Sequence, residues 1–254
     1  MITNLNTKGK VAIVTGSSRG IGFAIAKCFA GAEMKVFINS PRKESIGRAL
    51  LQLSKDGLSA EAIVGDATDE KFARTSVQNI LKENDHIDVL VNNLGIYEHR
   101  TFEEISVPQF QHFLNLNLIS TFLWTQAVLP IMKKHRYGKI INVASIAGIQ
   151  GRKFGAHYNA AKGGVVAMSL GLAKELGSFG VRVNVLVPGL VETETVKELQ
   201  ENSKKFIEEN LRGTPLGHLA TPEAVADSAL FLASPLSDEM TGQILYVDGG
   251  YHLQ

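Results

Sequence analysis

Three polar side chains near the middle of the chain, Ser145, Tyr158 and Lys162, have the types and spacing of an acid–base site. Tyr158 and Lys162 are four residues apart, so on a helix they lie on one face, about one turn from each other. A phenol is a poor acid–base catalyst at neutral pH, but a nearby lysine cation stabilises the phenolate. Ser145 follows an apolar run and can therefore offer a hydroxyl at the carboxyl edge of a sheet. Alone, the Tyr-x-x-x-Lys pair is more typical of a solvated helix face than of a catalytic site.

The composition of the 254-residue chain is that of an ordinary soluble enzyme, with 44% hydrophobic residues and a formal net charge of +1. No linker, charge block or repeat divides it, so we expect a single domain over residues 1–254. No basic stripe indicates nucleic-acid binding, and no apolar run approaches the roughly 20 residues of a membrane span. The N-terminus lacks a secretory signal and Cys28 is the only cysteine, which favours a cytoplasmic protein without an internal disulfide. We expect no metal site.

Short apolar runs alternate with helical patterns along the whole chain. Strands are expected at residues 10–15, 35–39, 60–64, 87–91, 139–144, 181–187 and 244–247. Helices are expected near residues 21–30, 43–55, 69–83, 108–134, 158–177 and 222–233. This alternation predicts βαβ units with right-handed crossovers. The expected fold is therefore α/β: a Rossmann-like, doubly wound parallel sheet of about seven strands, with helices on both faces.

Gly16, Gly20 and Gly22 lie between the first expected strand and the first expected helix, which is the context of a dinucleotide site. Glycines allow a tight turn and let a pyrophosphate approach the backbone, with the helix N-terminus facing its charge. Their spacing, Gly-x-x-x-Gly-x-Gly, differs from the common Gly-x-Gly-x-x-Gly. The position of the loop nevertheless predicts a nicotinamide dinucleotide cofactor.

Further motifs follow in a fixed order over nearly the whole chain. They are Thr15-Gly-x-x-x-Gly-Ile-Gly22, Asn92-Asn-x-Gly95, Asn117, Ser145, Tyr158-x-x-x-Lys162 and Pro188-Gly189. Together they resemble the short-chain dehydrogenase/reductase family, and within it the 3-oxoacyl carrier-protein reductases and related carbonyl reductases. The resemblance implies an oxidoreductase that interconverts a ketone and a secondary alcohol by hydride transfer.

The resemblance implies a role for each catalytic position. Ser145 would hydrogen-bond the substrate carbonyl, and Tyr158 would supply or remove the proton. Lys162 would bind the nicotinamide ribose and lower the pKa of Tyr158. Asn117 would hold the water that connects Lys162 to solvent; without the resemblance, a helix kink would explain this asparagine as well.

The resemblance also implies the cofactor contacts. Asp66 would meet the adenine, although a cap or turn explains it equally well from the residues alone. Asn93 and Gly95 would flank the adenosine ribose, and the segment from Val187 to Thr193 would contact the nicotinamide end. The expected cofactor-binding residues are Gly16, Ser17, Ser18, Arg19, Gly20, Ile21, Gly22, Asn39, Ser40, Arg42, Asp66, Ala67, Asn93, Gly95, Tyr158, Lys162, Pro188, Gly189, Val191 and Thr193.

Two positions depart from the family pattern. Leu94 stands where the family usually has an alanine, so its bulk either crowds the adenosine or only repacks the strand end. Glu33 stands where the first helix normally stops on a glycine, which is preferred in left-handed stops. We therefore expect a strained turn at Glu33 or an earlier stop at Gly31.

The choice between NADP and NAD follows from charge at the end of the second expected strand. An NAD enzyme usually carries an acid there that accepts from the ribose 2′-hydroxyl, and residues 37–42 contain none. Arg19 and Arg42 could bind a 2′-phosphate, with Ser17, Asn39 and Ser40 donating hydrogen bonds. The alternative is two solvated arginines. The sequence favours NADP(H).

The substrate side is less defined. Residues 189–221, rich in charge and helix formers, predict a substrate lid, although a charged surface hairpin fits equally well. Candidate pocket residues are Tyr97, Glu98, His99, Ile146, Gln150, Phe154 and His157. Because residues 97–100 match the acyl reductases poorly, a 3-oxoacyl thioester is one candidate beside a sugar, polyol or other small ketone. A non-catalytic NADP-binding sensor or scaffold is the alternative of another class.

The helices expected near 108–134 and 157–177 carry apolar residues on more than one face. These are Phe113, Leu116, Leu118, Phe122, Trp124, Val128, Val165, Val166, Met168, Leu170 and Leu172. One face should cover the sheet, which leaves a second stripe for a two-fold contact. The segment from Leu245 to Gly250 could form another contact, and the family resemblance likewise implies a homotetramer.

Overall fold

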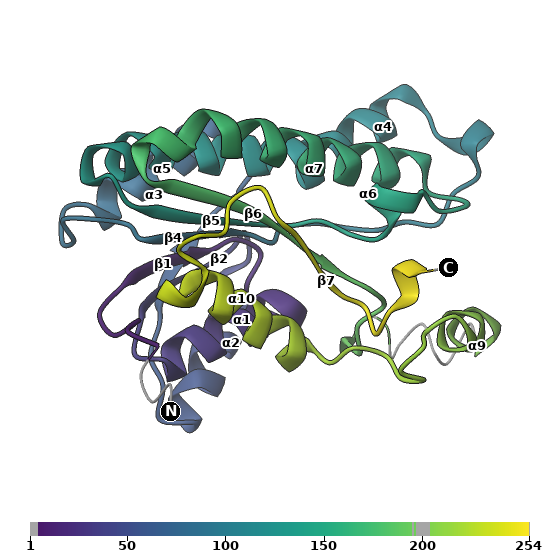
Figure 1. Ribbon diagram of the computed structural model, residues 1–254, viewed down its shortest axis with the longest axis horizontal. Helices are drawn as coiled ribbons and strands as arrows, with labels where there is room; N and C mark the ends of the chain where they lie inside the picture. Colours follow the sequence, from purple (N-terminus) through teal and green to yellow (C-terminus); the bar gives the residue numbers. More distant parts are fainter. Residues whose placement is uncertain (1–4, 195, 197–203, 254) are drawn as a thin grey trace.

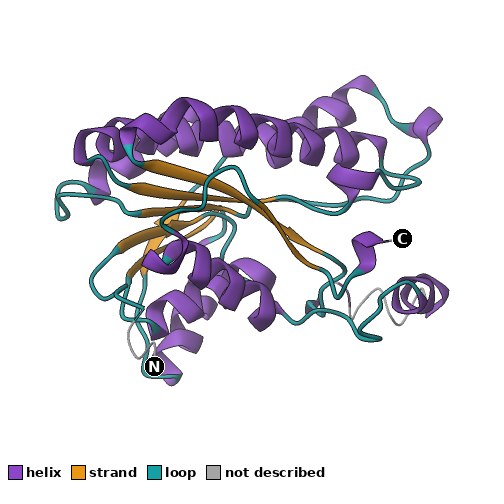
Figure 2. Cartoon of the chain, viewed as in Figure 1, coloured by secondary structure: helices purple, strands orange, loops and turns teal. Residues whose placement is uncertain are grey.

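The middle layer of the molecule is a seven-stranded sheet whose strand pairs are all parallel, in the order β3-β2-β1-β4-β5-β6-β7 (Figures 1 and 2). The computed structural model describes residues 5–194, 196 and 204–253. The strands are β1 Val11–Val14, β2 Lys35–Ser40, β3 Glu61–Val64, β4 Val89–Asn92, β5 Gly138–Val143, β6 Val181–Pro188 and β7 Ile244–Val247. The expected fold class is confirmed.

Helices cover both faces of the sheet (Figure 1). On one face lie α1 Gly20–Gly31, α2 Lys43–Lys55 and α10 Pro222–Ala233. On the other lie α3 Glu70–Ile80, α4 Val107–Leu114, α5 Ser120–His135 and α7 Ala156–Leu176. Shorter helices are η1 Phe102–Glu104, α6 Ala147–Gln150, η3 Gly177–Phe179, α9 Lys204–Arg212, η4 Pro235–Ser237 and η5 Tyr251–Leu253.

The strand β1 shows why the chain folds in this way. Its four residues are buried, and alternate side chains enter different hydrophobic clusters. Ala12 and Val14 join the cluster that contains Ile25 of α1, whereas Ile13 joins the cluster that contains Trp124 of α5. A strand covered on both faces is continuously apolar, as parallel sheets require.

The long helix expected near 108–134 runs from α4 to α5, with a π-helical turn at Asn115–Ile119 between them. Inside this turn the side-chain amide of Asn117 donates to the backbone carbonyl of Phe113, at 3.1 Å. A side chain that bonds the carbonyl four residues earlier disturbs the regular helix. The irregular turn presents Asn117 to the sheet edge.

By length and composition alone, the helical stretch Val107–His135 is apolar enough to cross a membrane. The sequence analysis did not expect such a segment. However, Trp124, Val128 and Met132 of this stretch are fully buried in a hydrophobic cluster with residues of the sheet. One face of the stretch therefore packs in the core of the domain.

A chain of buried polar groups fixes α5 and α7 relative to the strands. The amide of Asn92 in β4 donates to Thr125 of α5 at 3.0 Å and to Asn142 of β5 at 2.8 Å. The Asn142 amide donates in turn to Ser169 of α7, at 2.8 Å. Hydrogen bonds of this kind, buried in a low dielectric, are directional, so the two helices have a defined position on the sheet.

The turn between α1 and β2 shows both the early helix end and the strained residue that the sequence predicted. The helix α1 ends at Gly31, and Glu33 adopts the left-handed conformation with φ of 59°. The Glu33 carbonyl accepts from the amide of Gly9 at 2.8 Å, and its carboxylate pairs with Lys8 at 2.6 Å. These contacts hold a non-glycine residue in a conformation that is unfavourable for it.

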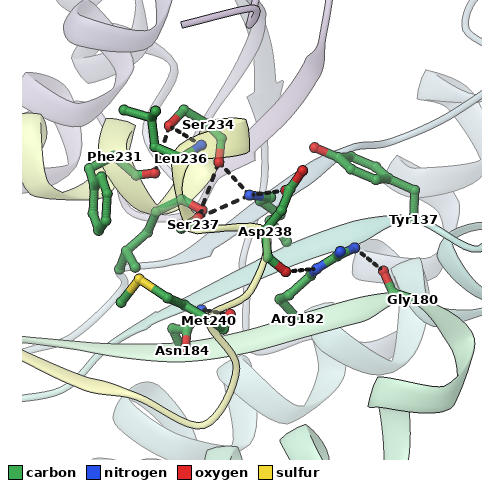
Figure 3. A network of polar contacts seen from close by, with 12 residues as sticks. Tyr137, Gly180, Arg182, Asn184, Phe231, Ser234, Leu236, Ser237, Asp238 and Met240 are labelled. Carbon is green, nitrogen blue, oxygen red and sulfur yellow. Dashed lines mark hydrogen bonds and ion pairs between the residues drawn. The ribbon is translucent and has the colours of Figure 1, made fainter. Parts of the chain in front are cut away.

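A network of polar contacts, which includes Ser234, Ser237 and Asp238, closes the amino edge of the sheet (Figure 3). Lys139 of β5 is 1% exposed; its ammonium donates to the Ser234 carbonyl and, at 2.9 Å, to the Ser237 hydroxyl. It also pairs with Asp238 at 2.7 Å, and burial lowers its pKa. Arg182 of β6 donates to the Asp238 carbonyl, at 2.9 Å. The segment after α10 is thereby tied to the central strands.

Candidate active site

The motifs of the sequence meet at the carboxyl edge of the sheet. The glycine loop follows β1, the turn from Asn93 to Gly95 follows β4, Ser145 follows β5, and Gly189 follows β6. Parallel strands end at the same edge, so segments far apart in the sequence come together there. The helix α7 then brings Tyr158 and Lys162 to the same edge.

Lys162 is buried at 3% exposure, and its ammonium donates to the Val143 carbonyl at the end of β5, at 2.8 Å. Tyr158, one turn earlier on α7, hydrogen-bonds with the Ser145 side chain. The Ser145 hydroxyl also accepts from the amide of Ala147, at 3.2 Å. The structure thus brings the three predicted catalytic side chains together.

The fourth predicted residue, Asn117, is fully buried, and its carbonyl oxygen accepts from the amide of Ile96 at 3.0 Å. Gly95 lies between this asparagine and Lys162. A Cβ added at Gly95 would be 2.7 Å from the Asn117 oxygen and 3.1 Å from the Lys162 nitrogen. The turn after β4 therefore requires glycine to let these two side chains approach it.

Burial and neighbouring groups act on the two titratable side chains. Burial lowers the pKa of Lys162 to about 8. Burial raises the pKa of Tyr158, and the Ser145 hydrogen bond and the positive charge of Arg152 oppose this effect. The sequence analysis named Ser145 but did not single out Arg152. The effect of Lys162 on the pKa of Tyr158 stays a prediction.

The glycine loop has the geometry of a pyrophosphate cradle. Gly16 and Gly20 adopt left-handed conformations, with φ of 61° and 57°. A Cβ at Gly22 would lie 2.4 Å from the Asn93 side chain, which itself donates to the carbonyls of Thr15 and Gly16. No side chain caps the first turn of α1, so its backbone amides can bind an anion. The residues present therefore fit a dinucleotide.

Two side chains that were predicted to bind a cofactor phosphate, Ser17 and Asn39, donate their hydrogen bonds to backbone carbonyls instead. Ser17 is fully buried, and its hydroxyl donates to the Val14 carbonyl at 2.6 Å. Asn39 is 1% exposed, and its amide donates to the carbonyls of Ile63 and Gly65 at 3.0 and 3.1 Å. The expectation that these side chains donate to a cofactor phosphate is corrected: they hold together the ends of β1, β2 and β3.

The remaining predicted contacts on the adenosine side lie near the ends of β2 and β3. Arg19 and Arg42 are exposed, whereas Ser40 is buried at the end of β2. The exposed Asp66 accepts from the amide and the hydroxyl of Thr68, both at 2.8 Å, which is the turn considered as its alternative role. Ala67 is buried, and its carbonyl accepts from Trp124.

Leu94 lies directly against the glycine loop. A Cβ at Gly16 would be 2.9 Å from the Leu94 Cα and 3.3 Å from its side chain. The Leu94 amide donates to the Thr15 hydroxyl, at 3.2 Å. The leucine therefore packs against the loop at the end of β1, next to the position expected for the adenosine.

The segment after β6 returns to the glycine loop. A Cβ at Gly20 would lie 3.5 Å from the Thr193 methyl group, and Val191 is buried and bridged to Ala220. In the expected lid, the described part after this bridge contains α9, whose Ile207 packs with Leu219. Residues 195 and 197–203 of the expected lid lie outside the described residues. Among the described residues, no group of three or more His, Cys, Asp or Glu side chains is placed to hold a metal ion.

This combination of parallel sheet, glycine loop and Ser–Tyr–Lys cluster defines an NAD(P)-dependent oxidoreductase acting on CH–OH or keto groups. The family model described as enoyl-(acyl carrier protein) reductase matches residues 16–252. The chain belongs to the short-chain dehydrogenase/reductase family.

The names of the similar proteins indicate more than one kind of substrate. The chain is 41% identical over 244 residues to a 3-oxoacyl-[acyl-carrier-protein] reductase of Chlamydia trachomatis, with 95% of this chain and 96% of the relative covered. It is 34% identical to the enzyme of the same name in Escherichia coli, with 98% and 100% covered. A solved putative NAD(P)-dependent gluconate 5-dehydrogenase of Beutenbergia cavernae, with bound NADP, has a TM-score of 0.92 and 33% identity, over 98% and 99% of the chains. A putative gluconate dehydrogenase of Agrobacterium tumefaciens has a TM-score of 0.93 and 31% identity, over 98% of each chain.

The buried position of Lys162 predicts a pH-dependent stability. Because burial lowers its pKa to about 8, the unfolded chain binds the proton more tightly above that pH. Stability contributed at this site should therefore increase as pH rises from about 8 towards the ordinary lysine pKa. Relative to Lys162→Met, wild type should gain on the order of 2 kcal/mol between pH 7.5 and 9.5, measured by urea unfolding.

The matched control is Lys174→Met, which removes an exposed lysine from the same helix. Its difference from wild type should be the same at both pH values. A wild type that loses stability relative to Lys162→Met over this range would contradict the lowered pKa of Lys162.

Proposed function

We propose that the protein is an NADP(H)-dependent oxidoreductase that interconverts a ketone and a secondary alcohol. The observation that carries this proposal is the convergence of Ser145, Tyr158 and Lys162 beside the glycine loop, with Gly95 packed between Lys162 and Asn117. In this proposal residues 1–254 act as one domain, and the segment 189–221 acts as a substrate lid.

In the proposed mechanism the nicotinamide supplies or accepts the hydride. Ser145 donates a hydrogen bond to the substrate oxygen and holds it beside the Tyr158 hydroxyl. Tyr158 donates its proton to that oxygen during reduction and removes it during oxidation. Lys162 binds the ribose hydroxyls of the cofactor and stabilises the phenolate by its charge. Asn117 holds the water through which a proton reaches Lys162.

For the substrate, a 3-oxoacyl thioester is supported by the names of the curated relatives, which the chain matches almost from end to end. The alternative substrate, a sugar or polyol, is supported by solved structures named as putative gluconate dehydrogenases. A non-catalytic sensor is disfavoured because Ser145, Tyr158, Lys162 and Asn117 are all present at one sheet edge.

The preference for NADP(H) rests on charge. The strand β2 ends at Ser40 without an acid that would repel a 2′-phosphate, and Arg19 and Arg42 are exposed near this end. Guanidinium groups bind phosphate oxygens in pairs of hydrogen bonds. The neighbour solved with bound NADP gives further support.

We also propose a cytoplasmic homotetramer. On α5, Trp124 and Val128 are buried against the sheet, whereas Phe122 is 43% exposed, and Ile119 just before it is 39% exposed. On α7 the small residues Ala160, Ala167 and Gly171 are exposed. An apolar face with small residues permits close two-fold packing of helices. The second contact of a tetramer would use the segment from Leu245 to Gly250.

The proposed mechanism makes a prediction about proton transfer. Tyr158→Phe keeps the ring but removes the proton donor, so turnover of a ketone should fall roughly 10²–10⁴-fold while NADPH binding is retained. Cofactor fluorescence titration and steady-state kinetics measure the two effects. Tyr137→Phe, which removes a phenol hydroxyl at the amino edge, is the control and should keep full turnover. Substantial activity in a folded Tyr158→Phe enzyme would overturn the assignment.

A second prediction concerns the cofactor. Ser40→Asp should repel the 2′-phosphate and offer an acceptor to a 2′-hydroxyl, so the ratio of kcat/KM for NADPH to that for NADH should fall at least about tenfold. Ser54→Asp adds the same charge at the exposed far end of α2 and should leave the ratio unchanged. The charge argument fails if wild type uses NADH and NADPH equally well.

A third prediction concerns assembly. Because the exposed faces of α5 and α7 are apolar, light scattering at micromolar concentration should give about four times the chain mass of 27.5 kDa. Phe122→Glu should shift the mass to half or less, whereas Leu51→Glu, at an exposed site on α2, should not. A wild-type mass near that of one chain would refute the assembly.

A further inference from the structure

Two loops form the rim of the site beside Tyr158, namely residues 97–100 after β4 and residues 151–155 after α6. The amide of Arg100 donates to the Phe154 carbonyl, at 2.8 Å. A Cβ added at Gly155 would lie 3.4 Å from the Tyr97 ring, so the second loop packs directly on this ring. The rim is therefore one connected structure, although both of its parts are loops.

Three aromatic rings follow one another along this rim. The Tyr97 ring meets the Tyr158 ring edge to face, with centroids 5.3 Å apart and an interplanar angle of 78°. Phe154, which precedes the glycine that touches Tyr97, has its ring centroid 4.7 Å from that of His99. In spite of these contacts, Tyr97 is 38% exposed and Phe154 is 47% exposed. The rim thus presents aromatic surface to solvent beside the phenol that transfers the proton.

Phe154 also has a backbone conformation that its side chain makes unfavourable. Its φ is 59°, in the left-handed region, where the Cβ of a bulky residue lies too close to the following carbonyl oxygen. Three further described residues other than glycine have a positive φ, namely Asn6, Glu33 and Arg136. Glycine would adopt this conformation without strain. Because strained residues gather at active sites and ligand clamps, the phenylalanine at this place on the rim indicates a role in binding.

We propose that Tyr97, His99 and Phe154 form an aromatic wall that binds a flat apolar group of the substrate, so that the enzyme prefers ketones that bear an aromatic ring. Aromatic rings attract one another in offset or edge-to-face arrangements, and their contact removes apolar surface from water. The substrate ketone would lie at Tyr158, and its ring would extend along the rim towards Phe154.

The contacts of the wall favour this role. The hydrogen bond to the Phe154 carbonyl and the contact with His99 order the Phe154 ring before a substrate arrives, which lowers the cost of binding. This inference rests on the function proposed above and narrows its substrate class, because it separates ring-bearing ketones from straight-chain and polyol substrates of the same reaction.

The test uses three esters with the same ketone, in which carbon 5 carries a hydrogen, a phenyl ring or a cyclohexyl ring. They are ethyl 3-oxopentanoate, ethyl 3-oxo-5-phenylpentanoate and ethyl 3-oxo-5-cyclohexylpentanoate. For wild type with NADPH, kcat/KM for the phenyl ester should exceed that for the unsubstituted ester at least about tenfold, and that for the cyclohexyl ester at least about threefold.

Phe154→Leu keeps an apolar side chain but removes the flat ring. It should lower kcat/KM for the phenyl ester about tenfold, mainly through KM, and change the unsubstituted ester less than about threefold. Phe154→Tyr keeps the ring and should retain the preference for the phenyl ester.

Phe154→Gly separates recognition from stability. It removes the ring and relieves the left-handed strain, so it should unfold at the same urea concentration as wild type or a higher one, yet lose the preference for the phenyl ester. Glu33→Gly is the matched control, because it relieves the same strain in the turn between α1 and β2. It should leave kcat/KM for all three esters within about threefold of wild type.

The proposal is overturned if wild type does not prefer the phenyl ester, if Phe154→Leu lowers kcat/KM for the three esters equally, or if Phe154→Gly unfolds at a markedly lower urea concentration. A lower mass of Phe154→Gly in light scattering, with an equal loss for the three esters, would place the ring in a contact between copies and also overturn it. If wild type reduces the unsubstituted ester as well as the phenyl ester, and Tyr158→Phe abolishes both activities, only the wall is refuted. If wild type turns over no ketone or alcohol of the proposed classes, the proposed function itself fails.

Discussion

The site depends on keeping an ammonium group out of water. Lys162 is buried, and its nitrogen donates to the Val143 carbonyl at the end of β5, at 2.8 Å. Burying a cation is costly, and the cost appears as the lowered pKa of this lysine. Gly95 is the complementary constraint, because any larger residue would occupy the space beside the nitrogen. A strand end, a turn and a helix must all be correctly placed before this cation is accommodated.

The buried polar chain in the core provides that placement. Asn92 and Asn142 occupy the ends of two neighbouring strands, and their amides reach α5 and α7. The same strand ends lead directly to Gly95 and Ser145, so the bonds that fix the helices also set the spacing of the site. Apolar packing alone would tolerate small shifts of α7 along the sheet, whereas directional hydrogen bonds do not.

The sequence predicted the sheet and the catalytic cluster because their signals are local. Apolar strands, glycine turns and the spacing of Tyr158 and Lys162 each constrain a few neighbouring residues. The roles of Ser17 and Asn39 were wrong because a polar side chain at a strand end serves a cofactor or the sheet, and only the tertiary contacts decide which. Arg152 was missed for the same reason. Its guanidinium lies near Tyr97, which is 55 positions away in the sequence, and only the folded chain brings the two side chains together.

Two cationic side chains, Lys162 and Arg152, lie near Tyr158, and their surroundings differ. Lys162 is buried, and its ammonium donates to the Val143 carbonyl, so the end of β5 holds this charge one helical turn from Tyr158. Arg152 is partly exposed, with its guanidinium carbon 5.6 Å from the Tyr97 ring centroid, and its positive charge opposes the effect of burial on the pKa of Tyr158.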